Sequence, residues 1–557
     1  MCWRCLLVRF RGVAFIYGPN PSNAIGENNG PHPFRDLEKI LDALSAVDDS
    51  REFSRRCRAA GVKPLFHPFW EQLPFVNIFY SITPDVLHQL YQGVVKHLIS
   101  WVQAAYGAEE IDARCSRMPP NHNLRHFGKG ISKMSRVTGG EHQDICRILL
   151  GLVAGMPLTG GVSPLRLVQA TRALLDFLYL AQYPVHTSHT LDLLDDARNR
   201  FHANKNVFRD LGIRSHFKLP KLHSFDHYRL SIELFGTTDN YDTQFSERLH
   251  IDFAKEAFRA TNKKHEFSQM TVWLERREKI HRHTAYIQSR IDKGSLISSR
   301  EPVVRPAKPR LSHVQLTRHP SVKGLEFEDA MVQYGATFFR DALTRFVAQT
   351  RHPDFTAAQV EHASAGIFFS FRKIAAFHKV KFWIEDESGL TIDDTNGPTD
   401  VAHAHPSRLG KHDKTIPGRF DTVLVKRSTD DGEQRSGVHR YQVAQLRLVF
   451  QLPEEAKNDL FPGHPSPPEY LAYIEHFTPF PRLPDPATGL YQVSRSLRGT
   501  SRLASIIPVE HILRSCHLIP RFGAVAPREW SSADVLEKCS TFYVNAFTDR
   551  NTYRLVY

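Results

Sequence analysis

Residues 83–102 read TPDVLHQLYQGVVKHLISWV and carry the clearest helical pattern of the chain. Leucine, valine and tyrosine recur there at spacings of three and four residues, so one face of the predicted helix should be buried. Thr83 suits the N-cap and Pro84 the first helical position, which would place Asp85 in the first turn. His88 follows three residues later and should share a helix face with Asp85.

A second block, residues 219–258, again places acids and histidines at helical spacing. His223 and His227 lie four residues apart, and Glu247 precedes His250 by three. Such pairs can cap a helix, bond to backbone groups, or line a metal-dependent phosphoryl-transfer site. For His223 and His227, a shared metal ion and two partly exposed histidines with separate partners are both open.

Composition bounds the class of protein. The chain has 557 residues, of which 41% are hydrophobic and 24% charged, values that are ordinary for a globular protein of several domains. Its formal net charge is +13 and its pI about 9.3. A basic surplus of this size favours polyanionic partners, although an unspecialised basic surface is the plain alternative.

Targeting and redox features are few. No apolar run is long enough to span a bilayer, and the arginine-interrupted opening does not resemble a secretory signal, so we expect no membrane partner and no secretion. Seven scattered cysteines favour a reducing compartment, the nucleus or the cytoplasm. Cys2 and Cys5 have no second CxxC to complete four ligands, so zinc is not expected.

The predicted fold class is α+β, with a helical first half and a β-rich end. We expect an irregular N-terminus (1–30), a helical domain (31–287), a basic Pro/Arg linker (288–323), a helical bridge (324–384), a flexible loop (385–418) and a small β-rich barrel or sandwich (419–557). The predicted helices are 34–44, 52–60, 83–102, 141–153, 165–181, 187–208, 221–235, 246–287, 325–349 and 357–377.

Several long phrases point to one family. They are Pro31-His-Pro-Phe-Arg-Asp-Leu-Glu, Pro84-Asp-Val-Leu-His-Gln-Leu-Tyr-Gln-Gly-Val, Phe201-His-Ala-Asn-Lys, Pro220-Lys-Leu-His and Glu247-Arg-Leu-His-Ile-Asp-Phe-Ala-Lys-Glu-Ala. With the order D-x2-H, H-x3-H and E-R-L-H, they resemble the Plavaka transposases of fungi, relatives of the CACTA class. The resemblance runs from about residue 29 towards the C-terminus and implies DNA cleavage and joining by a ribonuclease-H-like core with three catalytic acids and Mg²⁺.

The resemblance assigns roles to particular residues. Glu247 would be the third catalytic acid, on a helix packed against the nuclease sheet, and Asp85 with His88 would form the D-x2-H signature. The plainer readings are that Ser246 and Glu247 form a cap and first-turn acid, and that Asp85 complements the dipole of its own helix. His223 and His227 are the candidate metal-binding pair.

One departure from the family pattern limits the expected activity. Members of the family carry their first two catalytic acids and a cysteine-rich segment upstream of the Pro31 phrase, whereas the 30 preceding residues here read as an unrelated opening. A two-metal site needs several converging carboxylates. We therefore expect an N-terminally truncated, catalytically deficient transposase. The alternatives are an active Mg²⁺-dependent enzyme, a domesticated chromatin-binding protein and a transposon fossil.

Nucleic-acid contacts are predicted in two places. The helix predicted at 246–287 carries Lys263, Lys264, Arg276 and Arg277 among interleaved acids, and the linker carries Arg305, Lys308 and Arg310. The linker is either a solvated spacer or a basic arm on DNA. The C-terminal domain loosely resembles small β-barrels of the bromo-adjacent-homology kind, which suggests chromatin as a further partner.

Overall fold

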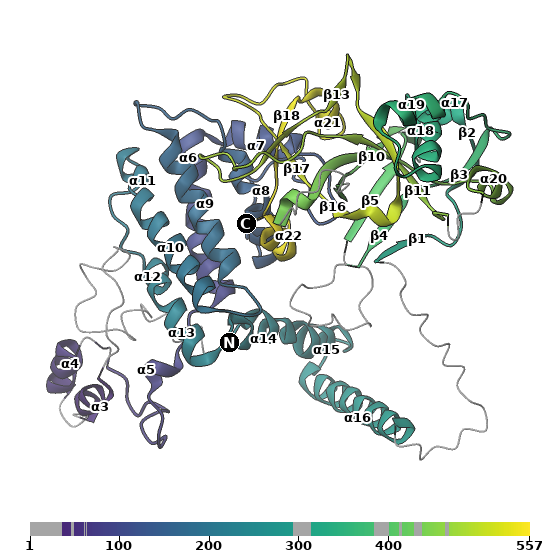
Figure 1. Ribbon diagram of the computed structural model, residues 1–557. Coiled ribbons are helices and arrows are strands. Elements are labelled where there is room, and N and C mark those ends of the chain that lie inside the picture. Colours follow the sequence, from purple (N-terminus) through teal and green to yellow (C-terminus); the bar gives the residue numbers. More distant parts are fainter. Residues whose placement is uncertain are drawn as a thin grey trace.

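The computed structural model describes residues 36–45, 50–60, 62, 64–292, 313–383, 400–410, 415–427, 437–462 and 467–556. Within these ranges, residues up to 292 form helices and loops, and the first strand begins at Val314 (Figure 1). The irregular N-terminus, Cys2, Cys5, and the linker residues Arg305, Lys308 and Arg310 lie outside the described residues.

A small helical unit comes first, on the same side of the molecule as α13 (Figure 1). Helices α3 (Leu37–Ser45), α4 (Ser50–Ala59) and α5 (Ile78–Ser81) enclose their own apolar cluster, which includes Phe53, Trp70 and Phe79. Ile40 and Leu44 of the predicted apolar stripe are buried in it, as the spacing of three and four residues requires.

A larger helical layer follows. It runs through η1 (Val86–Val95), α6 (Lys96–Tyr106), α7 (Ala108–Arg117), α8 (Gly139–Val153), α9 (Pro164–Leu180), α10 (Ser188–Asn204), α11 (Val207–Asp210), α12 (Pro220–His223), η2 (Ser224–His227), α13 (Tyr228–Phe235), η3 (Thr238–Asn240), α14 (Thr243–His250), η4 (Ile251–Lys255), α15 (Glu256–Arg259) and α16 (Glu266–Asp292). Thr138 and Glu141 form a capping box at the start of α8, which fixes where this buried helix begins.

Two predicted helices differ from the structure in their boundaries. The helix predicted at 187–208 is interrupted between α10 and α11, and the one predicted at 246–287 is four elements, α14, η4, α15 and α16. Lys263 and His265 adopt positive φ angles of 61° and 50° in the turn before α16. A continuous helix cannot include residues in that conformation.

The C-terminal part contains strands β1 (Val314–Leu316), β2 (Val322–Glu326), β3 (Lys373–Phe377), β4 (Lys379–Phe382), β5 (Asp400–His405), β6 (Arg408–Leu409), β7 (Thr415–Ile416), β8 (Arg419–Phe420), β9 (Thr422–Lys426), β10 (Tyr441–Gln451), β11 (Leu471–His476), β12 (Gln492–Ser494), β13 (Leu497–Arg498), β14 (Ser501–Arg502), β15 (Ala504–Pro508), β16 (Ile512–Ser515), β17 (Leu518–Pro520) and β18 (Thr541–Val544). Its helices are α17 (Phe327–Gln333), α18 (Phe339–Arg351), α19 (Ala357–Ser364), α20 (Glu454–Leu460), α21 (Val535–Lys538) and α22 (Arg550–Val556).

The long strand β10 is the centre of the largest sheet, whose order is β15-β11-β10-β3-β2. On the edge of β10 that β3 covers only in part, β9 pairs with the remaining half, and β16 pairs with β9. One face packs against α17 and α18, and the other shares a core with the four-stranded sheet β1-β4-β5-β8. The described strands form several open sheets and no closed barrel. The β-rich end is therefore confirmed, and the barrel is not.

Several ranges predicted as non-strand contain strands. Strand β1 and the start of β2 lie in the predicted linker (288–323), and β4 lies in the predicted helical bridge (324–384). Only the first part of the helix predicted at 357–377 is helical, as α19 (Ala357–Ser364), and β3 occupies Lys373–Phe377. The loop predicted at 385–418 contains β5, in which Val401, Ala402 and Ala404 are buried. Both strands are short, and alanine fills buried positions in each (Ala376 in β3, Ala402 and Ala404 in β5), so their sequences do not show the clear alternation of a half-buried strand.

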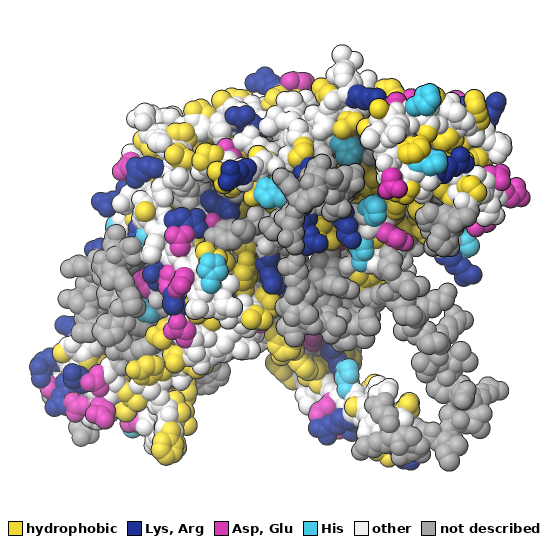
Figure 2. Space-filling model, in the orientation of Figure 1, with side chains coloured by type: hydrophobic (Ala, Val, Ile, Leu, Met, Phe, Trp, Pro, Cys, Tyr) yellow, Lys and Arg dark blue, Asp and Glu magenta, His cyan; other side chains and the backbone are white. Residues whose placement is uncertain are grey.

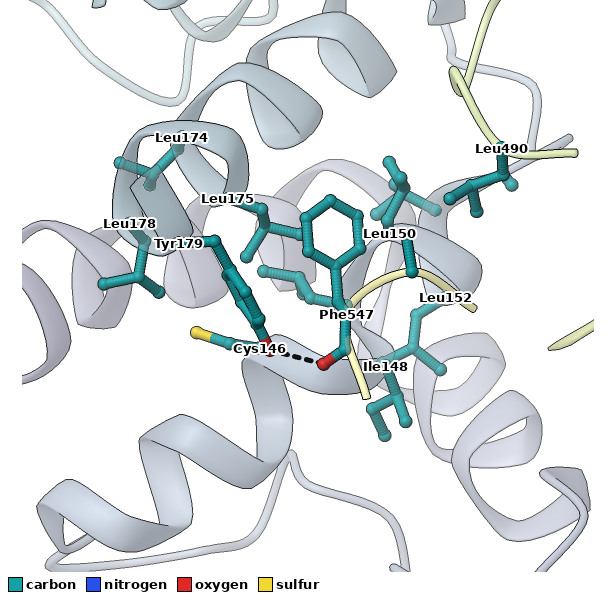
Figure 3. Packing of buried hydrophobic residues seen from close by; sticks show 14 of the residues in the cluster. Cys146, Ile148, Leu150, Leu152, Leu174, Leu175, Leu178, Tyr179, Leu490 and Phe547 are labelled. Atoms are coloured by element: carbon teal, nitrogen blue, oxygen red, sulfur yellow. Dashed lines mark hydrogen bonds between the residues drawn. The ribbon is translucent and has the colours of Figure 1, made fainter. Parts of the chain in front are cut away.

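The three-stranded sheet β12-β18-β17 packs onto the helical layer, and the two share one core. Figure 3 shows Leu150 and Leu152 of α8, Leu175 of α9 and Phe547 side by side, with the Tyr179 hydroxyl donating to the carbonyl of Phe547. Gly151 permits this close approach, because a Cβ there would lie 2.4 Å from Ile519 Cγ2.

Arg114 joins the same two parts without solvent contact. Its guanidinium pairs with Glu110 and donates to the carbonyls of Leu152, Ala154 and Gly523, and its side chain is fully buried. Such a buried cation is stable only because every carbonyl around it accepts a hydrogen bond. Among the described helices, none has the length and hydropathy that a membrane crossing requires.

Candidate functional site

Three side chains named from the sequence meet at the base of α14. The His88 imidazole lies between two carboxylates: Nδ1 donates to Asp85 Oδ2 at 2.6 Å, and Nε2 donates to Glu247 Oε1 at 2.7 Å. The Asp85–His88 pair follows from the spacing of three residues, whereas Glu247 arrives from a segment 159 residues later in the chain. The structure therefore unites Asp85, His88 and Glu247.

Asp85 is the N-cap of η1, two residues after the predicted cap Thr83. Its carboxylate accepts the backbone N–H of His88 at 2.8 Å. The second oxygen accepts both the N–H and the hydroxyl of Thr243, at 3.0 and 2.7 Å. An aspartate satisfies the open N–H groups of a helix start better than Thr83 could, because it accepts from several donors at once.

The hydrogen bonds on Asp85 set its charge. Burial alone would raise the pKa of this carboxyl group, but the bonds from His88 and Thr243 outweigh burial and lower the pKa to about 2. The pKa of His88 is raised, chiefly by its hydrogen bond to Asp85 and also by the charge of Glu247. The contacts with Asp85 and Glu247 therefore favour the protonated form of the His88 ring.

Local helix geometry presents His88 to this cluster. The segment η1 is wound as a π-helix, a form that leaves backbone groups without their usual partners and is frequent at functional sites. Lys221 of α12 lies over η1, and its Nζ donates a hydrogen bond to the carbonyl oxygen of His88 at 2.8 Å. Gly93 leaves the space, since a Cβ there would lie 2.6 Å from Lys221 Cδ.

Glu247 lies inside α14 rather than in its first turn. The cap of α14 is Asp242, whose side chain accepts from the Gln244 N–H, and Ser246 instead donates to the carbonyl of Thr243. The predicted cap-and-acid interpretation of Ser246 and Glu247 is therefore wrong. The Glu247 side chain is 41% exposed, so its second oxygen is within reach of solvent or a ligand.

Asp242 is an acid of this site that the sequence analysis missed. Burial raises its pKa, and the charge of Asp85 raises it further, which places the two carboxylates in electrostatic contact. Its position directly before the helix sequence Thr-Gln-Phe-Ser-Glu is the usual place of an N-cap aspartate. The sequence analysis instead placed the cap of this helix at Ser246.

The ribonuclease-H-like sheet expected behind Glu247 is not part of the described structure. Between residues 36 and 292, the described elements are helices, and α14 packs against η1 and η4. The sheet and the catalytic role of Glu247 remain predictions.

His223 and His227 face each other in a separate, buried place. Their Nε2 atoms are 3.3 Å apart, and His223 Nδ1 lies 3.7 Å from Asp226 Oδ2. Burial raises the pKa of Asp226 to about 6, which weakens it as a metal ligand near neutral pH. Among the described residues, no group of three or more His, Cys, Asp or Glu side chains is arranged to hold a metal ion.

The expected Mg²⁺ does not fit the cluster as it is arranged. A divalent ion needs free carboxylate oxygens, whereas both oxygens of Asp85 accept hydrogen bonds from His88 and Thr243. The ring of His88 lies between Asp85 and Glu247 and occupies the oxygen of each carboxylate that faces it. We therefore assign no metal-dependent step to these residues.

The predicted DNA-contact residues of the long helix have different environments. Lys263, Lys264 and Arg276 are exposed. Arg277 instead donates to the Asp252 carbonyl at 3.0 Å and lies 5.4 Å from the centre of the Trp273 ring. Arg277 therefore holds α16 against η4, and the other three are available to a partner.

Comparisons with known proteins give two family matches. Residues 18–102 match the family model described as Plavaka transposase, and residues 291–493 match the model of a domain of unknown function, DUF6830. No curated protein and no solved structure matches the chain. The first match supports a Plavaka-type transposase and includes Asp85 and His88, while Glu247 lies outside both ranges.

The Plavaka match begins earlier than the sequence phrases suggested. It includes residues 18–30, which were interpreted as an unrelated opening. That interpretation is wrong for these thirteen positions, because short Gly- and Asn-rich sequence carries no periodic pattern from which a single sequence can be assigned.

Proposed function

We propose that this chain is a transposase-derived DNA-binding protein of the Plavaka type, acting in the nucleus, in which the Asp85–His88–Glu247 cluster holds α14 in place and does not cut DNA. The match of residues 18–102 to the Plavaka family supports the transposase ancestry. The net charge of +13 supports a polyanionic partner.

The observation that carries the non-cutting part is the hydrogen bonding of the cluster. The His88 ring contacts Asp85 and Glu247 at 2.6 and 2.7 Å and so occupies one oxygen of each carboxylate. Charge-assisted hydrogen bonds of this length are strong and directional. Such a cluster joins η1 to α14 and so fixes the position at which α14 and the helices after it begin.

A second candidate function is an active Mg²⁺-dependent transposase. The convergence of Asp85, His88 and Glu247 from distant segments favours it, because inherited catalytic acids must meet in space. For activity, His88 would have to lose its proton and release both carboxylates. A chromatin-binding role for the β-rich part and a fossil without function are the remaining alternatives.

The deciding experiment combines DNA binding with strand cleavage. The purified chain is incubated with labelled transposon-end DNA and Mg²⁺ or Mn²⁺, beside Glu247→Gln and the matched control Glu233→Gln. Glu233 is an acid of similar exposure, 46%, on the nearby helix α13, where it pairs with Arg229. We expect salt-sensitive binding by all three proteins and no nicking by any of them.

Two different results would contradict these expectations. Nicking that Glu247→Gln abolishes and Glu233→Gln preserves would establish the active enzyme. Absence of DNA binding at low salt, where phosphate contacts are strongest, would reject DNA binding altogether.

A further inference from the structure

Four histidines form a row where the helical layer meets the β-rich part. The ring centres of His122 and His403 are 6.4 Å apart, those of His403 and His405 are 6.3 Å apart, and those of His405 and His378 are 5.9 Å apart. His122 belongs to the loop between α7 and α8, and the others to β5 and the β3–β4 turn. We call these four residues the histidine row.

Neighbouring groups hold three of the rings in place. His403 Nδ1 contacts Asp421 Oδ2 at 3.0 Å, His405 Nδ1 contacts the carbonyl of Pro406 at 3.1 Å, and His378 Nε2 contacts the Tyr334 hydroxyl at 2.9 Å. Because each ring uses one nitrogen for its partner, the other nitrogen can serve a ligand. His403 and His405 are two residues apart on one strand and therefore share a face.

Two arginines act on the row through their charge on His405. Arg408 is exposed, and Arg419 is half-buried. Among the described residues, two acids near the row are buried: Asp421 is paired with Arg419 and His403, and Asp400 accepts from Ser515, Asn123 and the Val401 N–H. The loop 119–138 that carries His122 contains no acid and has Arg125, Lys129, Lys133 and Arg136.

Figure 2 shows histidine side chains, with Lys and Arg beside them, on the face of the molecule where Figure 1 places β4 and β5. All four members of the row are half-buried or exposed. The spacing of about one ring every 6 Å is comparable with the separation of neighbouring phosphate groups along one nucleic-acid strand.

We propose that the histidine row is a contact strip for the phosphate backbone of DNA, in which each ring donates a hydrogen bond to a phosphate oxygen. This inference rests on the proposed DNA-binding function and names the surface that performs it. It differs from the sequence-based expectation, which placed the contacts on α16 and in the linker.

Proton uptake distinguishes this strip from a surface of Lys and Arg. Burial is the largest cause that lowers the pKa of His122, His378 and His405. The charges of Arg408 and of a neighbouring histidine lower the pKa of His378 and His405 further, whereas Asp400 and Asp421 oppose the shift at His122. These rings are therefore neutral at pH 7 in the free protein. A phosphate group favours the protonated ring and raises its pKa, so DNA binding should take up protons and strengthen as the pH falls.

The test measures the affinity for a short labelled DNA duplex at constant salt, in EDTA, from pH 8 to pH 6. We expect the affinity of the unaltered chain to rise about tenfold per pH unit for each proton taken up. The double variant His122→Gln/His405→Gln should lose most of this dependence while remaining folded by circular dichroism. The matched control His281→Gln/His283→Gln replaces two exposed histidines of α16 and should retain it.

Four results would overturn the strip. Binding that depends on salt but not on pH would reject it and leave the proposed function standing. An unchanged pH dependence in His122→Gln/His405→Gln would place the titrating groups elsewhere. Binding that requires added Zn²⁺ and is lost in EDTA would make the row a metal site instead. Absence of binding at every pH would reject both the strip and the proposed function.

Discussion

Two helical regions of the molecule are packed in opposite ways. One is the junction, where α8 and α9 meet the three-stranded sheet, and the other is the arm, formed by α14, η4, α15 and α16. Nearly every residue of α9 after its first turn is buried, whereas the described side chains of α16 are exposed or half-exposed, with Phe267 at 79% and Ile280 at 66%. Figure 1 shows α16 extending away from the rest of the molecule.

The comparison separates stability from candidate function. The junction gains from apolar burial and from Arg114, which joins three distant carbonyls. The arm carries the site residue Glu247 at its base and depends on a few polar contacts, among them His88 with Glu247 and Arg277 with Asp252. Changes at the junction should therefore unfold the protein, and changes on the arm should alter its partners.

The largest effect is expected at Arg114. Arg114→Met nearly keeps the volume of the side chain but removes the donor to three carbonyls and the cation paired with Glu110, which should cost about 3 kcal/mol of unfolding free energy. Denaturant unfolding followed by circular dichroism measures the loss. The control is Arg282→Met on α16, whose ion pair with Glu278 is solvent-exposed and should cost well under 1 kcal/mol. Equal losses in the two variants would contradict the contrast.

An intermediate effect is expected at Asp85, which bonds the first residue of the arm, Thr243. Because the folded pKa of about 2 lies below the ordinary value of 3.8, the charged form stabilises the fold by about 2 kcal/mol above pH 4. This contribution should disappear as the pH falls from about 4 to 2. Asp85→Asn should be less stable than the native chain at pH 7 and equally stable near pH 2, measured by thermal unfolding. A constant difference at every pH would reject the ionised cluster.

His88 should give the opposite trend at higher pH. Its raised pKa means that its contribution is complete below the ordinary value of 6.5 and is lost as the pH rises through the folded pKa.

The smallest effect is expected on the exposed face of α16. Ile280→Ser removes an apolar side chain that has little packing to lose, so the unfolding free energy should change by less than about 0.5 kcal/mol. The matched change at the junction is Ile148→Ser, since Ile148 is only 3% exposed and should lose several kcal/mol. A large loss at Ile280 would indicate that α16 is covered in solution.

Helices with a strong apolar repeat were predictable to within a few residues. The range 165–181 corresponds to α9 and 141–153 to α8, because leucine and valine at spacings of three and four define a buried face. The strands β3 and β5 were not predictable. Ala375, Ala376 and Ala404 suit a helix by propensity, and only pairing with β10 and with β8 makes them strand residues.

The candidate site was predictable in its parts but not in its assembly. The contact of Asp85 with His88 follows from helix geometry, whereas that of His88 with Glu247 depends on how α14 returns to η1. The histidine row shows the same limit. His403 and His405 lie in the range predicted as a flexible loop. Their sequence does not reveal that the ring of His122, from the helical layer, has its centre 6.4 Å from that of His403.

The shared core around Gly151 has a consequence for how the chain reaches its native state. The apolar faces of α8 and α9 are completed by residues such as Ile519, Phe542 and Phe547, about 370 positions later. During synthesis these faces must wait, uncovered, until almost the entire polypeptide has left the ribosome. Contacts of such long range slow folding and expose the nascent chain to aggregation. A message shortened before the last strands would therefore yield a helical layer that needs a chaperone rather than a smaller working protein.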